Sequence, residues 1–314
     1  MINFRTDIEL EKVKGAFAIQ DPDITNELKE FCISTYEWKD LFVNNGVHPI
    51  QEQYKETFYK WIKDSKHNTI EGLADFNHVT ITNGTSEAFT MFMMKHNTRR
   101  MRFFKGDFMM HKIASNIMDM DWEFIDPTMK NDVMHGDAVI ISCPFSDTGE
   151  EHENMQHVID RAQLLRCPVL IDMAYFGMCK GINIDLSRPC IETVTFSLGK
   201  TFPLIGARAG IRFQREEIDD PVNFANQVGI VNNLGCMIGN FAMEAWDADY
   251  IPNKYGEAYT RFCEDNDITL TKCMLFATTT DTKFESINRG NRTTRLCVSD
   301  YVLDAYKRIQ LENG

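Results

Sequence analysis

The chain has 314 residues, 43% of them hydrophobic and 25% charged, and a formal net charge of −13 at pH 7. This composition is ordinary for a soluble globular protein and argues against disorder across most of the chain. The acidic balance argues against a nucleic-acid partner, which would require a basic surface. No run of eighteen apolar residues and no apolar stretch after Met1 is present, so we expect no membrane span or membrane partner and no signal peptide.

The nine cysteines are scattered along the chain, and no Cys-x-x-Cys motif occurs. The simplest interpretation is a set of free thiols in a reducing compartment, so we expect a cytoplasmic protein. His152 and His157 are five residues apart rather than four, so they would not share the helix face that a zinc-protease motif requires. We therefore expect no metal site.

In chain order, the sequence before residue 70 is polar and predicts mainly helices. From about residue 78, short β-rich runs alternate with helix-like runs. We predict strands and the helices between them at residues 78–81 (strand), 86–95 (helix), 138–141 (strand), 153–165 (helix), 168–171 (strand) and 193–196 (strand). Continuous apolar strands separated by helices are typical of a mostly parallel α/β sheet covered on both faces. Ligands bind such sheets at the carboxyl ends of the strands.

Beyond about residue 220 the pattern turns helical again, with no Pro/Gly-rich linker at the change. We predict a large domain over residues 50–220. A smaller domain would be built from residues 221–314, together with residues 1–49 as an N-terminal segment.

Three polar clusters each follow a predicted strand directly. The first runs from strand to helix through Gly84, Thr85 and Ser86. A helix N-terminus with neighbouring hydroxyl groups suits a phosphate, although Ser or Thr before a helix is more often only an N-cap.

The second and third clusters carry charged groups. Asp172 ends a strand and Tyr175 follows it, an arrangement that alone would suggest a turn cap beside a partly buried ring. Ser197 and Lys200 follow the next strand, with Arg208 eight residues beyond the lysine. Lysines are usually solvated, but here Phe, Leu and Gly surround the amine, and desolvation would lower its pKa and favour Schiff-base chemistry.

These clusters, in this order at strand ends, resemble the class I/II aminotransferase family of fold-type I enzymes that use pyridoxal 5′-phosphate (PLP). The resemblance covers roughly residues 40–215 well and the C-terminal hundred residues weakly. It implies an α/β fold with a large domain around a mostly parallel sheet and a smaller α+β domain. It also implies PLP as cofactor, a small-molecule amino acid and oxo acid as substrates, and a homodimer.

The resemblance also implies a role for individual residues. Lys200 would hold PLP as a Schiff base and move the α-proton, Asp172 would pair with the pyridine nitrogen, and Tyr175 would donate to the phenolic oxygen of the ring. The other cofactor contacts that it implies are the ring-stacking Phe108 and, around the phosphate, Gly84, Thr85, Ser86, Ser197 and Arg208.

Two positions depart from the family pattern. Ser146 stands where an asparagine normally bonds the phenolic oxygen of the cofactor, and Phe42 stands roughly where many members have a tyrosine that reaches the partner subunit's phosphate. Asn44 or Asn45 could supply polar groups near the latter position. The chain is also short for the family, so we expect simplified substrate-pocket elements.

The run that begins at Arg295 resembles the late strand whose arginine grips the substrate α-carboxylate. Arg292 competes for this role, and in a continuous strand the two side chains would lie on opposite faces. Transamination is the reaction that we expect. A PLP-dependent lyase or decarboxylase on the same scaffold remains an alternative, as does a PLP-binding protein without turnover.

Overall fold

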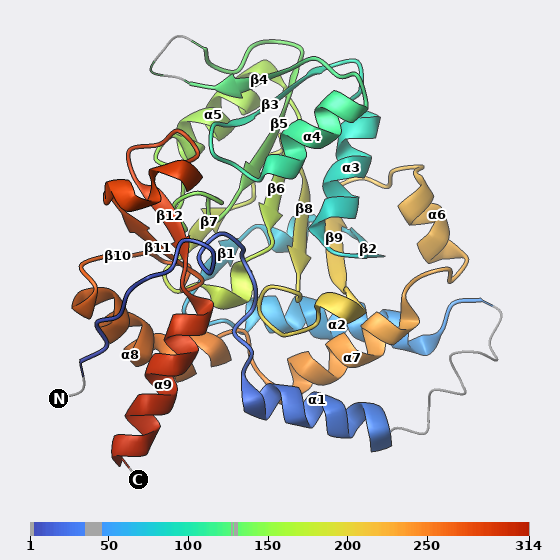
Figure 1. Ribbon diagram of the computed structural model, residues 1–314. Helices are drawn as coiled ribbons and strands as arrows, with labels where there is room; N and C mark the ends of the chain where they lie inside the picture. The colour runs from blue at the N-terminus through green and yellow to red at the C-terminus, as the bar shows by residue number, and fades with distance from the viewer. Residues whose placement is uncertain (1–2, 35–45, 127, 129–130, 314) are drawn as a thin grey trace.

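The computed structural model describes residues 3–34, 46–126, 128 and 131–313. Its centre is a seven-stranded sheet with the strand order β2-β9-β8-β6-β5-β3-β4 (Figure 1). The strands are β2 (His78–Thr82), β3 (Arg100–Phe104), β4 (Trp122–Ile125), β5 (Asp137–Ser142), β6 (Val169–Met173), β8 (Ile191–Ser197) and β9 (Gly210–Gln214). Strand β9 runs antiparallel to both of its neighbours, and the other adjacent pairs are parallel. The predicted mostly parallel α/β sheet is confirmed.

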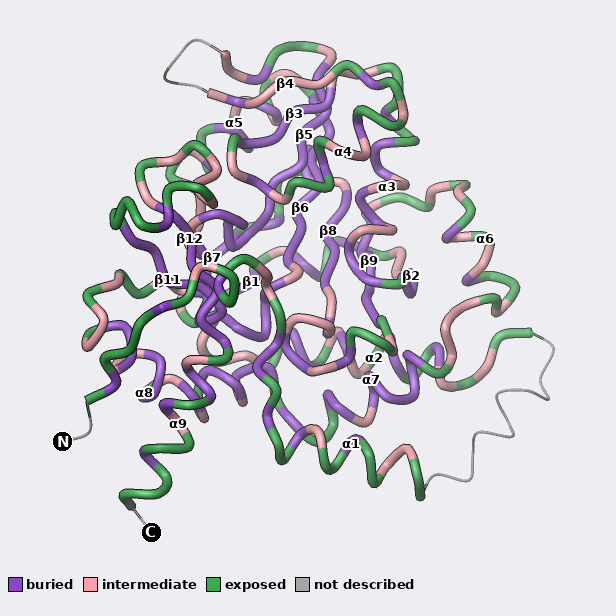
Figure 2. Tube along the Cα trace, in the orientation of Figure 1, coloured by how far each residue is buried: buried purple, intermediate pink, exposed green. Residues whose placement is uncertain are grey.

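Both faces of this sheet are covered, as the continuous apolar strands predict. On β5, Val139 and Ile141 pack into one hydrophobic cluster, whereas Ala138 and Ile140 pack into a second one. The first cluster includes apolar residues of helix α5 (Met155–Leu165), and the second those of helix α3 (Thr85–Lys95). Successive strand residues point to opposite faces, so an unbroken apolar run serves two cores. Figure 2 shows the central strands as the buried part of the molecule.

Most of the predicted strand and helix boundaries shift by one or two residues. The third predicted strand begins at Val169 rather than Pro168, and the helix expected from residue 153 begins at Met155. Proline lacks the backbone N–H that a strand ladder needs, which explains the later start of β6. The fourth strand is longer than predicted and starts at Ile191.

The remaining helices lie mostly before and after the central region. They are α1 (Pro22–Ser34), α2 (Pro49–Lys63), α4 (Met109–Ile117), α6 (Pro221–Gln227), α7 (Asn233–Ala245), α8 (Tyr250–Asp265) and α9 (Ser299–Asn313). Short 3₁₀ turns are η2 (Leu73–Asp75), η4 (Phe176–Met178), η5 (Ile205–Ala207) and η6 (Thr282–Ile287). Helix α6 begins where the sequence indicates, because Asp220 caps the backbone N–H of Asn223 and Pro221 occupies the first helical position.

Residues 3–21 form no helix, in contrast to the prediction for the N-terminal region. Their polar backbone groups bond to other segments instead: Phe4 N–H donates to Asp265 at 2.7 Å, and the carbonyl of Val13 accepts from Cys297 N–H at 2.9 Å. The segment thus runs beside α8 and the small sheet before α1 begins (Figure 1).

The C-terminal part contains a small antiparallel sheet of β10 (Thr269–Leu270), β11 (Phe276–Thr279) and β12 (Thr294–Cys297). Strand β12 overlaps the predicted late strand but begins one residue before Arg295. Strands β10 and β11 were not predicted because they are short and lack clear alternation. A separate parallel pair joins β1 (Thr69–Glu71) to β7 (Asn183–Asp185). The division into two domains near residues 50 and 220 stays a prediction. Within the described ranges, no helix combines the length and the apolar character that crossing a membrane requires.

Candidate active site

Polar groups gather at one edge of the central sheet. Strands β2, β5, β6 and β8 share one direction, so their carboxyl ends lie at the same edge. A cavity of about 150 Å³ opens there. It is lined by Thr85, Ser86, Phe108, Ser142, Asp172, Ala174, Tyr175, Ser197, Lys200 and Arg208. Apart from Ser142 and Ala174, these are residues that the sequence singles out.

Lys200 lies just beyond the end of β8, with its amine in the cavity. Its Nζ donates to the carbonyl oxygen of Ala16 at 2.6 Å, so the irregular N-terminal segment reaches the site. Burial lowers the pKa of Lys200, and the guanidinium groups of Arg295 and Arg208 lower this pKa further. A lowered pKa increases the neutral, nucleophilic fraction of the amine.

Asp172 occupies the penultimate position of β6 and is only 3% exposed. Its Oδ2 accepts from the Thr85 hydroxyl at 3.2 Å, and its Oδ1 accepts from the backbone N–H of Ala174 at 3.0 Å. Burial raises the pKa of Asp172 to about 7, and the nearby carboxyl group of Asp107 contributes to the rise. A cationic N–H group placed against this carboxyl group would lower its pKa and favour its ionised form.

A second buried layer lies behind Asp172. His111 in the first turn of α4 is fully buried, and its Nε2 lies 4.0 Å from Asp172 Oδ2. Neither ring nitrogen of His111 has a hydrogen-bond partner among the described residues, and burial lowers the pKa of this histidine. Phe89 and Phe108 pack edge-on against the ring. The sequence analysis missed His111; its position one helical turn beyond Phe108 was the available signal.

Asp107 holds the end of β5 in place. Its carboxylate accepts from the Ser142 hydroxyl, from Ser142 N–H at 3.2 Å and from Phe108 N–H at 2.6 Å. This contact fixes both Ser142 and Phe108, which line the cavity. Asp107 was not predicted as a site residue, because nothing in the local sequence indicates its contact with a strand end 35 residues away.

The start of helix α3 carries a group of residues suited to an anion, Gly84, Thr85, Ser86, Ser197 and Arg208, which we call the anion cradle. Helix α3 starts at Thr85 after Gly84, whose φ of +90° favours glycine. A Cβ atom on Gly84 would lie 3.0 Å from Arg208 Nη2 and 3.6 Å from Ser197 Oγ, so both side chains converge on the helix N-terminus. Arg208 is exposed, and its Nε donates to the carbonyl of Asn83 at 3.0 Å. Free helix N–H groups, hydroxyls and a guanidinium together suit a phosphate.

Tyr175 and Ser146 lie on the side of the small sheet. Burial raises the pKa of Tyr175 to about 12, while Arg295 and the Ser146 hydroxyl oppose the rise. The Tyr175 ring packs edge-on against Phe276 of β11 at 5.0 Å. Ser146 is 1% exposed, does not line the cavity, and its Oγ has no hydrogen-bond partner within the described ranges. Its hydroxyl lies close enough to Tyr175 to lower the pKa of the tyrosine.

Arg295 extends from β12 and is 6% exposed. Its Nη1 donates to the Ser146 carbonyl at 2.6 Å, and its guanidinium lies 4.5 Å from the centre of the Phe276 ring. Arg292 is exposed and precedes β12, so the expectation that both arginines alternate along one strand does not apply. Arg289, which the sequence analysis did not consider, lies with its Nε 3.7 Å from the buried Asp147 carboxylate.

Phe42, Asn44 and Asn45 lie outside the described residues.

Residues 105–249 match the family model of aminotransferase class I and II. The resemblance to this family is confirmed. No curated protein matches the chain in sequence. A putative kynurenine aminotransferase from Saccharomyces cerevisiae superimposes with a TM-score of 0.67 at 13% identity, covering 96% of this chain and 90% of that one. A putative aminotransferase from Burkholderia pseudomallei has a TM-score of 0.62 at 13% identity, with 95% and 97% covered.

A PLP-dependent cyclase is also similar, with a TM-score of 0.63 at 14% identity, covering 96% of this chain and 93% of that one. At such identities the structural similarity shows the fold and not the reaction. The chain therefore has the fold-type I aminotransferase architecture, and its chemistry has to be argued from its own residues.

Proposed function

We propose that this protein is a PLP-dependent aminotransferase that acts on an α-amino acid and an oxo acid. The observation that carries the proposal is one cavity that brings together the Lys200 amine, the Asp172 carboxylate and the anion cradle at the start of α3. Each group alone has an ordinary structural explanation. Together they match an aldehyde, a pyridine nitrogen and a phosphate on one small planar molecule.

The residues present fit this cofactor. Its phosphate would lie against Gly84, Thr85, Ser86, Ser197 and Arg208, and Phe108 would lie against its ring. One feature of the protein favours a bound group of this kind: the space at the start of α3 that a Cβ on Gly84 would fill. When bound, PLP supplies an aldehyde that condenses with amines and a ring that accepts electrons.

The chain's own groups would then control the protons. The lowered pKa of Lys200 leaves its Nζ able to accept a proton from the substrate carbon and return it elsewhere. The Asp172 carboxylate would hold the pyridine N–H proton, and the raised pKa of Tyr175 keeps its hydroxyl protonated as a donor. Arg295 would bind the substrate carboxylate, since its charge lowers the pKa of both Tyr175 and Lys200, although it does not itself line the cavity.

A PLP-dependent lyase, decarboxylase or cyclase is the second candidate, favoured by the similarity to a cyclase. These reactions use the same lysine and ring contacts and differ in which substrate bond lies perpendicular to the ring. Formation of an oxo acid with transfer of the amino group to a second oxo acid would distinguish transamination from them.

The test begins with the Lys200→Ala variant. After incubation with PLP and reduction with borohydride, the wild-type protein should carry the cofactor on the peptide that contains Lys200. The variant should lose this link, whereas Lys105→Ala, an exposed lysine near Gly290, should keep it. Cofactor attached to another lysine in the Lys200→Ala protein would refute the assignment. Amino-acid donors added singly would then be scored by oxo-acid formation.

A homodimer is part of the same proposal. Several large apolar side chains are exposed, including Ile205 at 63%, Ile230 at 73% and Val47 at 48% exposed. Residues 46–47 pack directly against Gly229, so two of these side chains belong to one surface region. Exposed apolar side chains that share one surface region suit contact with a second copy of the chain.

A further inference from the structure

Two buried cysteines face each other where the small sheet meets the central sheet. Cys179 follows the turn η4, and Cys273 precedes strand β11. The two residues form an isolated antiparallel β-bridge, and both are 0% exposed. They are 94 positions apart in the sequence, so no local pattern brings them together.

The backbone hydrogen bonds define the geometry of this pair. Lys180 N–H donates to the Lys272 carbonyl at 2.9 Å, and Met274 N–H donates to the Met178 carbonyl at 3.0 Å. These bonds flank the two cysteines instead of joining them, which makes the cysteines a non-hydrogen-bonded antiparallel pair. Such pairs have Cα atoms about 4.5 Å apart and side chains on the same face. That spacing lies inside the range of roughly 4.4–6.8 Å that a disulfide spans.

The Cys273 thiol is close enough to influence the ionisation of the Cys179 thiol. Burial is the main cause that raises the pKa of Cys179 well above its ordinary value. The neighbouring Cys273 thiol is the second cause. The Cys179 thiol also donates to the Tyr175 carbonyl at 3.0 Å, so it points toward the tyrosine loop.

The residues on either side of the two cysteines line a surface groove. Met178, Lys180, Lys272 and Met274 line a groove of about 770 Å³. Neighbouring residues on a strand point to opposite faces, so the cysteine side chains lie beneath the floor of this groove. A small molecule in the groove therefore reaches the thiols only when the bridge opens.

We propose that Cys179 and Cys273 are a disulfide-forming pair, oxidised by a small disulfide such as oxidised glutathione. One cysteine thiolate attacks a sulfur of glutathione disulfide, breaks its S–S bond and releases one glutathione thiolate. The second cysteine thiolate then attacks the sulfur of the first cysteine in this mixed disulfide, which forms the Cys–Cys bond, breaks the bond to glutathione and releases the second glutathione thiolate. Two protein thiols are oxidised, one glutathione disulfide is reduced, and the two protons end on the glutathione thiols.

The bond would lock the small sheet against the candidate active site. Cys179 lies four residues beyond Tyr175, and Cys273 lies three residues before Phe276, whose ring packs on that tyrosine. Strand β11, in turn, pairs with β12 and positions Arg295 opposite Thr278. A cross-link here would restrict movement of Arg295 relative to Tyr175. This inference does not depend on the proposed reaction.

The experiment treats the purified protein with oxidised glutathione, with no urea and with urea below the unfolding transition. Remaining thiols are then alkylated, and unreduced peptides are mapped by mass spectrometry. We expect two of the nine cysteines to be lost together and the peptides of Cys179 and Cys273 to be linked. Urea should accelerate the reaction, because the bridge has to open, and should raise the yield without changing the partners.

Matched variants make the assignment specific. Cys143 is also fully buried and close enough to influence the pKa of Cys179, so Cys143→Ser is the control and should keep the link. Cys273→Ser should abolish the link and leave Cys179 free or joined to glutathione, with circular dichroism to verify the fold. A Cys143–Cys179 link, or stable glutathione adducts without a Cys179–Cys273 link in the folded wild-type protein, would overturn the proposal. Absence of any link at every urea concentration below unfolding would do so as well.

Discussion

At the scale of single residues, Asp172 shows how strongly burial controls the chemistry of this site. Its pKa rises from an ordinary 3.8 to about 7, so the folded protein binds more protons than the unfolded chain between these values. The free energy of unfolding should therefore fall as pH increases through that window, by up to roughly 4 kcal/mol from this group.

Asp172→Asn should remove this contribution from the cofactor-free protein. We expect urea unfolding at pH 5 and pH 8 to differ less in the variant than in the wild type, whereas Asp160→Asn on the surface should leave the difference unchanged. In the cofactor-loaded protein, the same variant should lose most turnover, because a neutral amide cannot hold a pyridinium charge. An identical pH dependence in variant and wild type would show that Asp172 ionises normally.

Arg295 provides the second prediction at this scale. Arg295→Lys keeps the charge but loses the planar fork, so the KM for an amino acid should rise about tenfold, equivalent to one charge-assisted hydrogen bond. Affinity for PLP should stay unchanged. Arg292→Lys is the matched control, since Arg292 is exposed and lies outside β12, and it should leave KM unaffected. The reverse pattern, with Arg292→Lys as the damaging variant, would move the carboxylate site.

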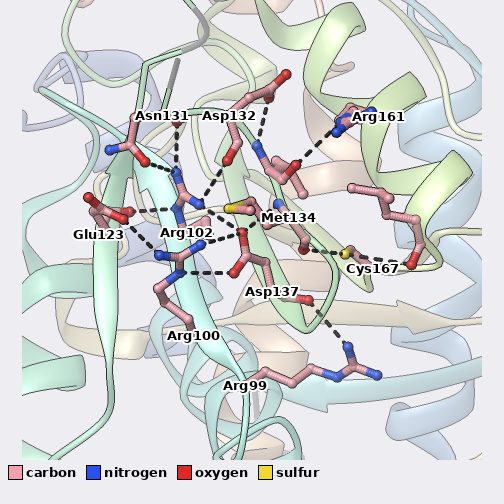
Figure 3. Close-up of polar contacts among 12 residues, drawn as sticks. Arg99, Arg100, Arg102, Glu123, Asn131, Asp132, Met134, Asp137, Arg161 and Cys167 are labelled. Carbon is pink, nitrogen blue, oxygen red and sulfur yellow. Dashed lines mark hydrogen bonds and ion pairs between the residues drawn. The ribbon is translucent and has the colours of Figure 1, made fainter. Parts of the chain in front are cut away.

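At the scale of elements, an ion network fixes one edge of the central sheet. Arg102 of β3 is 0% exposed and donates to Asp137 of β5 at 2.7 Å and to the Asn131 side chain at 2.9 Å (Figure 3). Arg100 also donates to Asp137, at 3.0 Å. The network links β3 and β5 with the segment that precedes β5, and none of its members lines the cavity.

Asp137→Ala should therefore destabilise the protein without changing cofactor affinity. Removing this carboxylate leaves the buried Arg102 charge without its anionic partner, which costs about 3–5 kcal/mol. Glu123→Ala is the control: Glu123 pairs with Arg100 at 2.9 Å but is 46% exposed, so its loss should cost at most about 1 kcal/mol. Urea unfolding midpoints measure both effects. Equal losses of unfolding free energy in the two variants would contradict the prediction that the buried ion pair contributes more to stability than the exposed one.

At the scale of the whole molecule, the exposed apolar side chains near the site bear on assembly. If the proposed homodimer buries Ile230, then Ile230→Asp should weaken the dimer at least about tenfold, which corresponds to the burial of one aliphatic side chain. Leu311→Asp on α9 is the matched control, because Leu311 is 83% exposed but lies on the C-terminal helix. Sedimentation at micromolar concentration would measure both. A wild-type monomer with full activity would refute the proposed dimer.

The sequence by itself determined four strands of the central sheet, β2, β5, β6 and β8, and most of the cavity lining, whereas β3, β4 and β9 were not predicted. Apolar runs such as residues 138–141 could be predicted as strands because a strand that is buried on both faces has an unbroken hydrophobic sequence. Asp172 and Ser197 could be predicted as site residues because each ends a strand, and parallel strands bring their carboxyl ends to one edge of the sheet.

Only the tertiary structure decided the contacts between distant segments. The Ala16 carbonyl at Lys200, the approach of His111 to Asp172 and the pairing of Cys179 with Cys273 each join residues at least 60 positions apart. Such contacts depend on how complete elements pack. A local pattern of residue types does not indicate which distant surface a side chain will contact. The sequence therefore indicates which groups lie at the edge of the sheet, while the packing of the N-terminal segment and small sheet decides what lies against them.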